Sequence, residues 1–165
     1  MTHDDVGGES PCFAELLDAS TIDDQLLGQL VRDLADAVVV ADADGTIVFW
    51  NDAASRLFGW TADGALGQSL DLIVPERQRA RHWEGYRRVM ATGHTQYGDR
   101  LLEVPALHSD GRRLSIAFTV SLLRRPGLTA PVGIAAVIRD DTERWQERRR
   151  LRDELAALRG ESADT

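Results

Sequence analysis

The sequence of 165 residues contains no lysine, and all nineteen of its basic residues are arginine. Without a lysine amine, the chain can form no Schiff base and no lysine-dependent phosphate loop. Cysteine is nearly absent as well, because Cys12 is the single one. An internal disulfide and a cysteine-rich metal site are therefore excluded.

Long apolar runs are also missing. No stretch approaches the length that a membrane-spanning helix needs. The first residues show no basic region followed by an apolar segment, which is the pattern of a secretory signal. We therefore expect a cytoplasmic protein with no membrane partner.

The balance of charge is acidic, with a formal net charge of −8. A nucleic-acid-binding surface needs clustered positive charge, so this balance argues against a nucleic-acid partner. No Ser-His-Asp spacing, paired-carboxylate motif or Gly-x-Gly-x-x-Gly loop stands out, so the sequence gives no reason to expect an enzyme. The chain is long enough for one domain with a hydrophobic core.

The most informative stretch is 37–60, which reads AVVVADADGTIVFWNDAASRLFGW. Two β-rich runs, 37–41 and 46–50, flank an Asp-Gly pair that is typical of a tight hairpin turn. Asn51 then ends the second run and can cap a helix, since its side chain accepts from free N–H groups of the first turn. Gly59 is placed to end that helix. The pattern predicts a hairpin followed by a short helix.

This unit resembles the opening of a PAS domain, and three later blocks, at 67–76, 109–123 and 137–144, resemble the blocks that follow in that family. The resemblance covers residues 30–145. It implies an α+β fold, in which a five-stranded antiparallel sheet carries short helices on one face and leaves a pocket between them. In the opening unit the resemblance is carried by Asp42, Asp44, Gly45, Ile47, Asn51, Ala53, Gly59 and Trp60.

Segments on both sides of the PAS domain, 37–140, complete the predicted organisation. Residues 1–20 form an acidic leader that we expect to be disordered. An amphipathic helix at 21–36 either joins a dimer interface, as often in the family, or merely covers the sheet. The C-terminal signalling helix, 141–159, has an apolar seam too short for a stable coiled coil alone, and a tail at 160–165 follows. We expect a stand-alone module that forms a homodimer and acts through a downstream signalling protein.

A helix is predicted at 76–92, closed by Gly93. His82, Tyr86 and Val89 recur at intervals of three and four, so they share one face. The opposite face is predicted to carry Arg77, Arg81, Glu84 and Arg88.

Part of this helix, RHWEGYRRVMATG at 81–93, resembles the heme-binding helix of oxygen-sensing PAS domains, in particular through His82, Tyr86, Arg88 and the Met-Ala-Thr-Gly ending. The resemblance implies that His82 is the protein ligand of the iron of heme b. It also implies that Arg88 contacts a heme propionate. A single axial histidine leaves the sixth iron position open for a gas.

The same resemblance implies residues on the gas side of the heme. Arg100 would hydrogen-bond bound oxygen, and Phe118 and Val120 would wall that side. Photosensory flavin PAS domains place a reactive cysteine on a central helix, and the absence of one here argues against that branch.

Three functional hypotheses follow. The first is a heme-based sensor of a diatomic gas (O2, NO or CO) or of redox state. The second is a heme-free module that binds a small organic ligand or mediates protein–protein contacts. The third is a peroxidase-like heme enzyme, although no distal acid/base histidine is evident.

Overall fold

The computed structural model describes residues 23–95 and 100–161. The predicted leader, 1–20, and the end of the predicted tail, 162–165, lie outside the described residues. None of the helices within the described ranges has the length and apolarity that crossing a membrane requires.

A five-stranded sheet forms the centre of the fold, with the strand order β2-β1-β5-β4-β3 and antiparallel pairing throughout. The predicted α+β architecture is therefore confirmed. Pro105 lies in β3, an edge strand, where its missing N–H costs no ladder hydrogen bond on the open side. The strands are β1 (Ala37–Asp42), β2 (Ile47–Trp50), β3 (Leu102–Leu107), β4 (Arg113–Leu123) and β5 (Gly133–Asp140).

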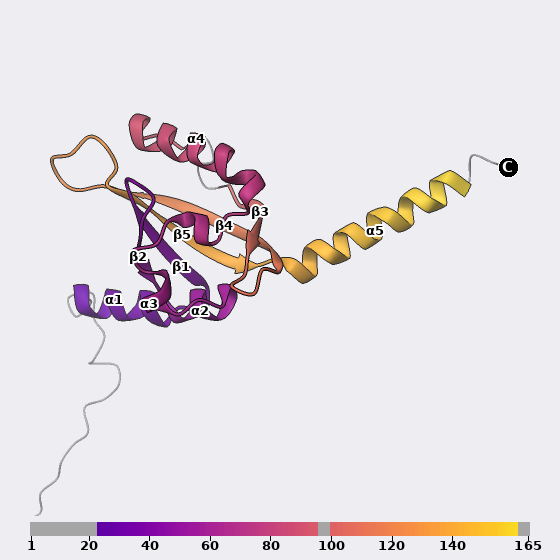
Figure 1. Cartoon of the computed structure of the whole chain (residues 1–165), viewed down its shortest axis with the longest axis horizontal. Helices are drawn as coiled ribbons and strands as arrows, with labels where there is room; N and C mark the ends of the chain where they lie inside the picture. Colours follow the sequence, from indigo (N-terminus) through magenta and orange to yellow (C-terminus); the bar gives the residue numbers. More distant parts are fainter. Residues whose placement is uncertain (1–22, 96–99, 162–165) are drawn as a thin grey trace, which may run out of the picture.

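The helices lie around this sheet as Figure 1 shows. They are α1 (Asp24–Asp33), α2 (Asp52–Phe58), α3 (Ala62–Ala65), α4 (Glu76–Thr92) and α5 (Thr142–Glu161). Three helices, α2, α3 and α4, pack on the sheet face that carries Val39, Ile116 and Ile138, together with a short 3-10 helix at Leu70–Leu72. The helices α1 and α5 flank the domain. The predicted flanking helices are both present, with α1 shorter than expected and α5 slightly longer.

Asn51 joins three elements at the start of α2. Its Oδ1 accepts from the backbone N–H groups of Val38 and Ala54, both at 2.9 Å. Its Nδ2 donates to the carbonyl oxygens of Val31 at 3.3 Å and Asp36 at 3.1 Å. The predicted cap is confirmed, and the same side chain, which is 2% exposed, also links β1 to α1 and to the segment that follows it.

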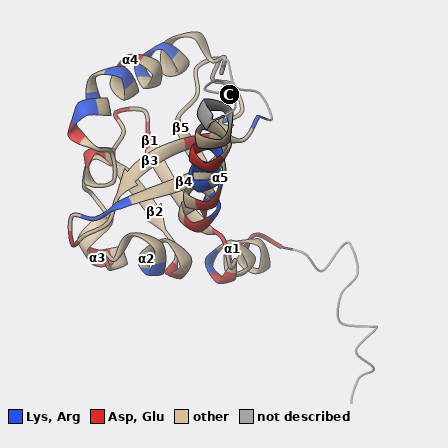
Figure 2. Ribbon diagram, turned by 90° about the vertical axis from the view of Figure 1, so that its right-hand side faces the viewer, with Lys and Arg blue, Asp and Glu red and all other residues tan. Residues whose placement is uncertain are grey.

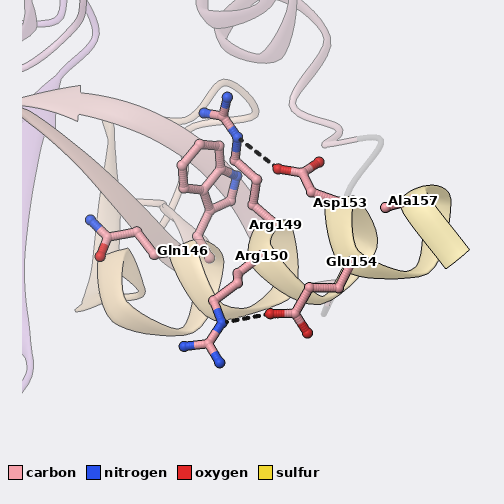
Figure 3. A pocket seen from close by; sticks show the side chains of 7 residues that line it. Gln146, Arg149, Arg150, Asp153, Glu154 and Ala157 are labelled. Atoms are coloured by element: carbon pink, nitrogen blue, oxygen red, sulfur yellow. Dashed lines mark hydrogen bonds and ion pairs between the residues drawn. The ribbon is translucent and has the colours of Figure 1, made fainter.

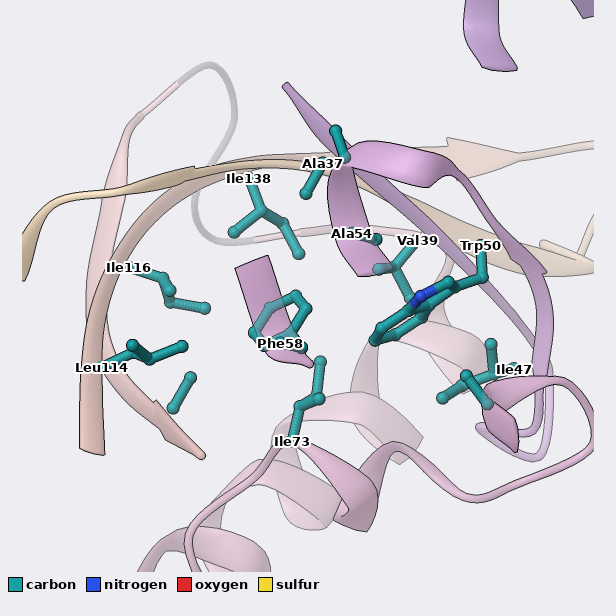
Figure 4. Packing of buried hydrophobic residues seen from close by; sticks show 13 residues of the cluster. Ala37, Val39, Ile47, Trp50, Ala54, Phe58, Ile73, Leu114, Ile116 and Ile138 are labelled. Atoms are coloured by element: carbon teal, nitrogen blue, oxygen red, sulfur yellow. The ribbon is translucent and has the colours of Figure 1, made fainter. Parts of the chain in front are cut away.

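The hydrophobic core lies where α2 and α3 pack on the sheet. Phe58 is fully buried at its centre, and its ring lies 5.4 Å from that of Trp50. Figure 4 shows Phe58 surrounded by side chains from both helices and strands. Gly59 ends α2 at φ 75°, a left-handed conformation that favours glycine.

The turn between β1 and β2 connects the sheet to α4. Asp42 Oδ1 accepts from the N–H groups of Asp44 at 3.0 Å and Thr46 at 2.9 Å, which builds the predicted turn. A Cβ on Gly45 would lie 2.3 Å from the ring of Trp83. Only glycine therefore lets this turn approach α4 so closely.

At its other end, the domain is joined to α5 through buried charge. Asp141 is 7% exposed and binds Arg148, with 2.6 Å between Oδ2 and Nη2. Arg148 also donates to Glu103 Oε1 of β3 at 2.8 Å. Beyond this anchor, α5 extends away from the domain (Figure 1), with Leu151 and Leu155 exposed.

Candidate functional site

A cavity of about 690 Å³ lies between α4 and the sheet. Alternate residues of a strand point to the same face, and this alternation supplies the floor of the cavity from three strands. Most of the floor is apolar. The floor residues are Val39, Ala41, Ile116, Phe118, Val120, Ile134, Ala136 and Ile138.

The opposite wall comes from one face of α4. Gln78, His82, Gly85, Tyr86 and Val89 line the cavity at helical spacing. A Cβ added at Gly85 would meet nothing within 4 Å, so the cavity extends up to the backbone of the helix there.

His82 is the polar group with the most unusual environment in this wall. Its Nδ1 is buried and has no hydrogen-bond partner among the described residues. Its ring packs against Trp83 and Tyr86, with centroids 5.0 Å and 5.9 Å away. Burial lowers the pKa of His82 below its ordinary value of 6.5, and the carboxylate of Asp71 partly opposes that shift. The imidazole is therefore neutral at neutral pH, which is the form that coordinates a metal.

The surroundings restrict what kind of metal His82 could bind. Within the described ranges, no group of three or more His, Cys, Asp or Glu side chains is placed to hold a metal ion. The apolar cavity beside a single nitrogen donor fits a metal whose other ligands come from an organic ring. The residues present therefore fit a heme group.

Tyr86 has a structural role in this wall. Its hydroxyl donates to the carbonyl oxygen of Asp42 in the β1–β2 turn. Burial, with the nearby carboxylates of Asp42 and Asp44, raises the pKa of Tyr86 well above its ordinary value. The phenol therefore stays protonated and fixes α4 to the turn, together with Trp83.

The structure brings four of the six predicted site residues together, since His82, Tyr86, Phe118 and Val120 all line the cavity. The two arginines are not among the lining residues. Arg88 is exposed and pairs with Glu84 at 2.6 Å on the outer side of α4. Arg100 is exposed at the start of the segment before β3.

Two other arginines do line the cavity. Arg77 and Arg81 were predicted to lie on the opposite face of α4, and that prediction is wrong. Both are exposed, and both contribute to the cavity wall beside His82. A sequence signal exists, because a long arginine side chain next to an apolar stripe can lie along it while its charge stays in water.

A second hollow, on the surface of α5, lacks the features of a binding site. Figure 3 shows that its lining residues all come from this one helix. They bind one another, through Arg150–Glu154 at 3.0 Å, Arg149–Asp153 at 3.9 Å and the stacking of Arg149 on Trp145. Because no second element closes over it, this groove cannot enclose a ligand.

Several curated bacterial proteins resemble most of this chain. A protein of Azorhizobium caulinodans without a characterised function is 38% identical over 117 residues, which are 70% of this chain and 16% of the relative. The sensor protein FixL of Bradyrhizobium diazoefficiens is 29% identical over 77% of this chain and 25% of its own length. The oxygen sensor protein DosP of Escherichia coli is 23% identical over 78% of this chain and 16% of its own length. The chain thus spans a quarter or less of these curated relatives.

Solved structures show the same fold. A PAS domain from Colwellia psychrerythraea superposes with a TM-score of 0.63 at 22% identity, covering 72% of this chain and 97% of that one. An RNA-binding light-oxygen-voltage receptor superposes with a TM-score of 0.64 at 22% identity, and the match covers 90% of this chain and 41% of the receptor. The family model of the PAS fold matches residues 25–140. The chain therefore belongs to the PAS family and contains a PAS sensory domain.

Proposed function

We propose that this PAS domain binds heme b in the cavity beneath α4, with His82 as the protein ligand of the iron. The observation that carries the proposal is the buried Nδ1 of His82, which has no partner in the described part of the chain. A buried polar nitrogen without a partner is costly unless a ligand satisfies the ring. The resemblance of residues 81–93 to a heme-binding helix, and the oxygen sensor among the relatives, support the same proposal.

The residues of the chain have distinct roles in this proposal. When bound, heme supplies an iron atom whose open sixth position takes a diatomic gas. Phe118 and Val120 exclude water from the cavity, and Tyr86 fixes the helix that carries His82. Arg100 would hydrogen-bond bound oxygen, as the resemblance implies, although it is exposed and is not among the residues that line the cavity.

Glu103 offers a path from the cavity to α5. It lines the cavity on β3 and holds Arg148 of α5 through its carboxylate. Arg148 is also bound to Asp141 at the start of α5. We infer that a change in the cavity that moves β3 shifts α5, and that the domain works as a sensor rather than as an enzyme.

The flanking helices provide the proposed dimer contact. Leu30 of α1 is 58% exposed and Leu155 of α5 is 55% exposed, and PAS domains commonly dimerise. Burying such leucines between two copies removes apolar surface from water. Sedimentation should show a dimer in the wild-type protein. The double variant Leu151→Arg with Leu155→Arg should be a monomer, whereas the control Gln146→Arg, which lies away from these leucines, should remain a dimer. A dimer that resists the leucine changes would contradict this contact.

Absorption spectroscopy tests the heme proposal. Purified protein titrated with hemin should develop a Soret band at one equivalent, and His82→Ala should lose it while remaining folded. His94→Ala is the matched control, because His94 is exposed outside the cavity and its Nδ1 lies 2.7 Å from the carbonyl oxygen of Thr92. A wild-type protein that takes up no hemin would refute the proposal.

The cavity also supports a second candidate, a small organic ligand without iron. Its volume lies within the roughly 300–1,000 Å³ of small-molecule sites, and its walls are mostly apolar. A hemin-free protein that binds such a ligand would favour this candidate. Turnover with peroxide would separate a heme enzyme from a heme sensor.

A further inference from the structure

The cavity beneath α4 is not apolar at every point. Arg77 and Arg81, one helical turn apart, contribute two guanidinium groups to its wall. Both side chains belong to exposed residues, so their charges lie where the cavity meets water. Figure 2 marks such basic positions along α4.

Two other arginines of α4 already have partners. Arg79 donates to the carbonyl oxygens of Val74 and Asp71, and Arg88 pairs with Glu84. Among the ion pairs of the described residues, none involves the two arginines of the cavity wall.

The carboxylates near the cavity are engaged elsewhere. Glu103 lines the cavity, but its carboxylate accepts from Arg148, and that bond lowers the pKa of Glu103. Asp71 accepts from the indole N–H of Trp83 at 2.8 Å and lies 3.6 Å from Arg79. Two cations therefore lie beside an apolar cavity, and no carboxylate of the described residues forms an ion pair with them.

We propose that Arg77 and Arg81 recognise an anionic group, so that the ligand of the cavity is an apolar body carrying at least one carboxylate. This inference rests on the proposed function insofar as a ligand occupies this cavity. A guanidinium matches a carboxylate in a planar, two-bond geometry. The apolar floor takes the body of the ligand, while its carboxylate stays at the rim. A heme propionate and the carboxylate of a small organic acid share this chemistry.

The first arm of the test compares hemin with hemin dimethyl ester, which has the same ring and iron but no propionate charge. Wild-type protein should bind hemin about tenfold more tightly, a modest factor because the arginines are exposed. In the double variant Arg77→Gln with Arg81→Gln, the ratio of the affinity for hemin to the affinity for its ester should fall close to one. The affinity for the ester should stay unchanged. Arg56→Gln with Arg87→Gln, which removes the same charge from exposed positions outside the cavity, should keep the wild-type ratio of the two affinities.

The outcomes separate this inference from the heme proposal. If hemin binds and the ratio survives Arg77→Gln with Arg81→Gln, the inference is overturned and the heme proposal stands. The inference is overturned in the same way if Arg56→Gln with Arg87→Gln abolishes the preference for hemin over its ester while Arg77→Gln with Arg81→Gln does not. Loss of ester binding together with hemin binding in the Arg77 and Arg81 variant overturns the inference too, because the arginines would then act through the fold.

The second arm measures the binding of decanoate and decanol by the tryptophan fluorescence of the protein, to which Trp83 of α4 contributes. It applies also to a protein that takes up no hemin. If wild type binds decanoate more tightly than decanol, and the double variant Arg77→Gln with Arg81→Gln loses this preference, the result supports the inference for an organic acid. If wild type shows no anion preference in either arm, or binds none of the four probes, the inference is overturned.

Discussion

Two halves of the same sheet face are covered in different ways. Over one half, α2 and α3 lie directly on the strands, and Phe58 fills the space between them (Figure 4). Over the other half, α4 stands away and leaves a cavity of about 690 Å³. Ile116 and Ile138 belong to the core and also line the cavity. Because the same strands serve both halves, the difference comes from the helices.

The side chains that each helix presents explain the difference. α2 places Ala53 and Ala54 against the sheet, and such small side chains let a helix lie close. α4 places His82 and Tyr86 there, and it is attached through the hydrogen bonds of Tyr86 and Trp83 rather than by apolar packing. The hollow half can therefore hold a ligand without taking apolar contacts away from the core.

The largest expected effect on stability comes from removing the Phe58 ring from the half of the sheet face that α2 and α3 cover. Phe58→Ala should lower the free energy of unfolding by about 3–5 kcal/mol, because it leaves a void in close-packed surroundings. Phe118→Ala should cost roughly 1–2 kcal/mol, since part of that ring already faces the cavity. Urea denaturation of the two variants gives the comparison. Equal losses would mean that the two halves are packed alike.

Asn51 supports the filled half from its edge, and its removal should have the next largest effect. Asn51→Ala should cost about 2–3 kcal/mol, because the buried N–H groups of Val38 and Ala54 lose their acceptor. Thr61→Ala is the matched control, since Thr61 caps α3 by accepting from Gly64 at an exposed site. We expect the control to cost about 0.5–1 kcal/mol. Similar melting temperatures for the two variants would show that burial adds nothing to the cap.

A smaller effect should follow from a change in the hollow half. Gly85→Ala should raise the free energy of unfolding by about 0.5–1 kcal/mol, because alanine favours a helix more than glycine and its Cβ would enter open space. Gly59→Ala should instead destabilise the protein, since φ is 75° there and a Cβ would lie 2.4 Å from Ser109 Oγ. Thermal melts of both variants check the contrast. Destabilisation by Gly85→Ala would indicate that the wall at this position is closed.

The sequence sufficed to predict the parts of the site that depend on local periodicity. Helical spacing put His82 and Tyr86 on one face, and strand alternation put Phe118 and Val120 on another. Asn51 was predictable as a helix cap from its place between a strand and a helix. Its hydrogen bonds to Val31 and Asp36 were not predictable, because they depend on how α1 and the segment after it pack against the sheet.

The arginines show where local patterns fail. Arginine in an amphipathic helix usually indicates a solvated face, yet Arg77 and Arg81 line the cavity because α4 stands away from the sheet. The position of Arg100 depends on the connection between α4 and β3, whose path no periodicity specifies. The pairing of Arg88 with Glu84 was visible as an i, i+4 spacing, which competes with any role in the cavity.

The smallest expected effect on stability comes from the protonation of His82. This effect reports how far water is excluded from the imidazole in the cavity. Burial lowers the pKa of His82 in the native protein, while the unfolded chain keeps the ordinary value of 6.5. Well above that pH the imidazole is neutral in both states, and His82 contributes no pH dependence. As the pH falls below it, the unfolded chain binds a proton that the native protein resists, so the free energy of unfolding falls. Denaturation at a series of pH values should therefore show wild type losing stability relative to His82→Gln in acid only. His94→Gln, at an exposed position, should follow wild type throughout, and parallel curves for wild type and His82→Gln would mean that water already reaches the ring.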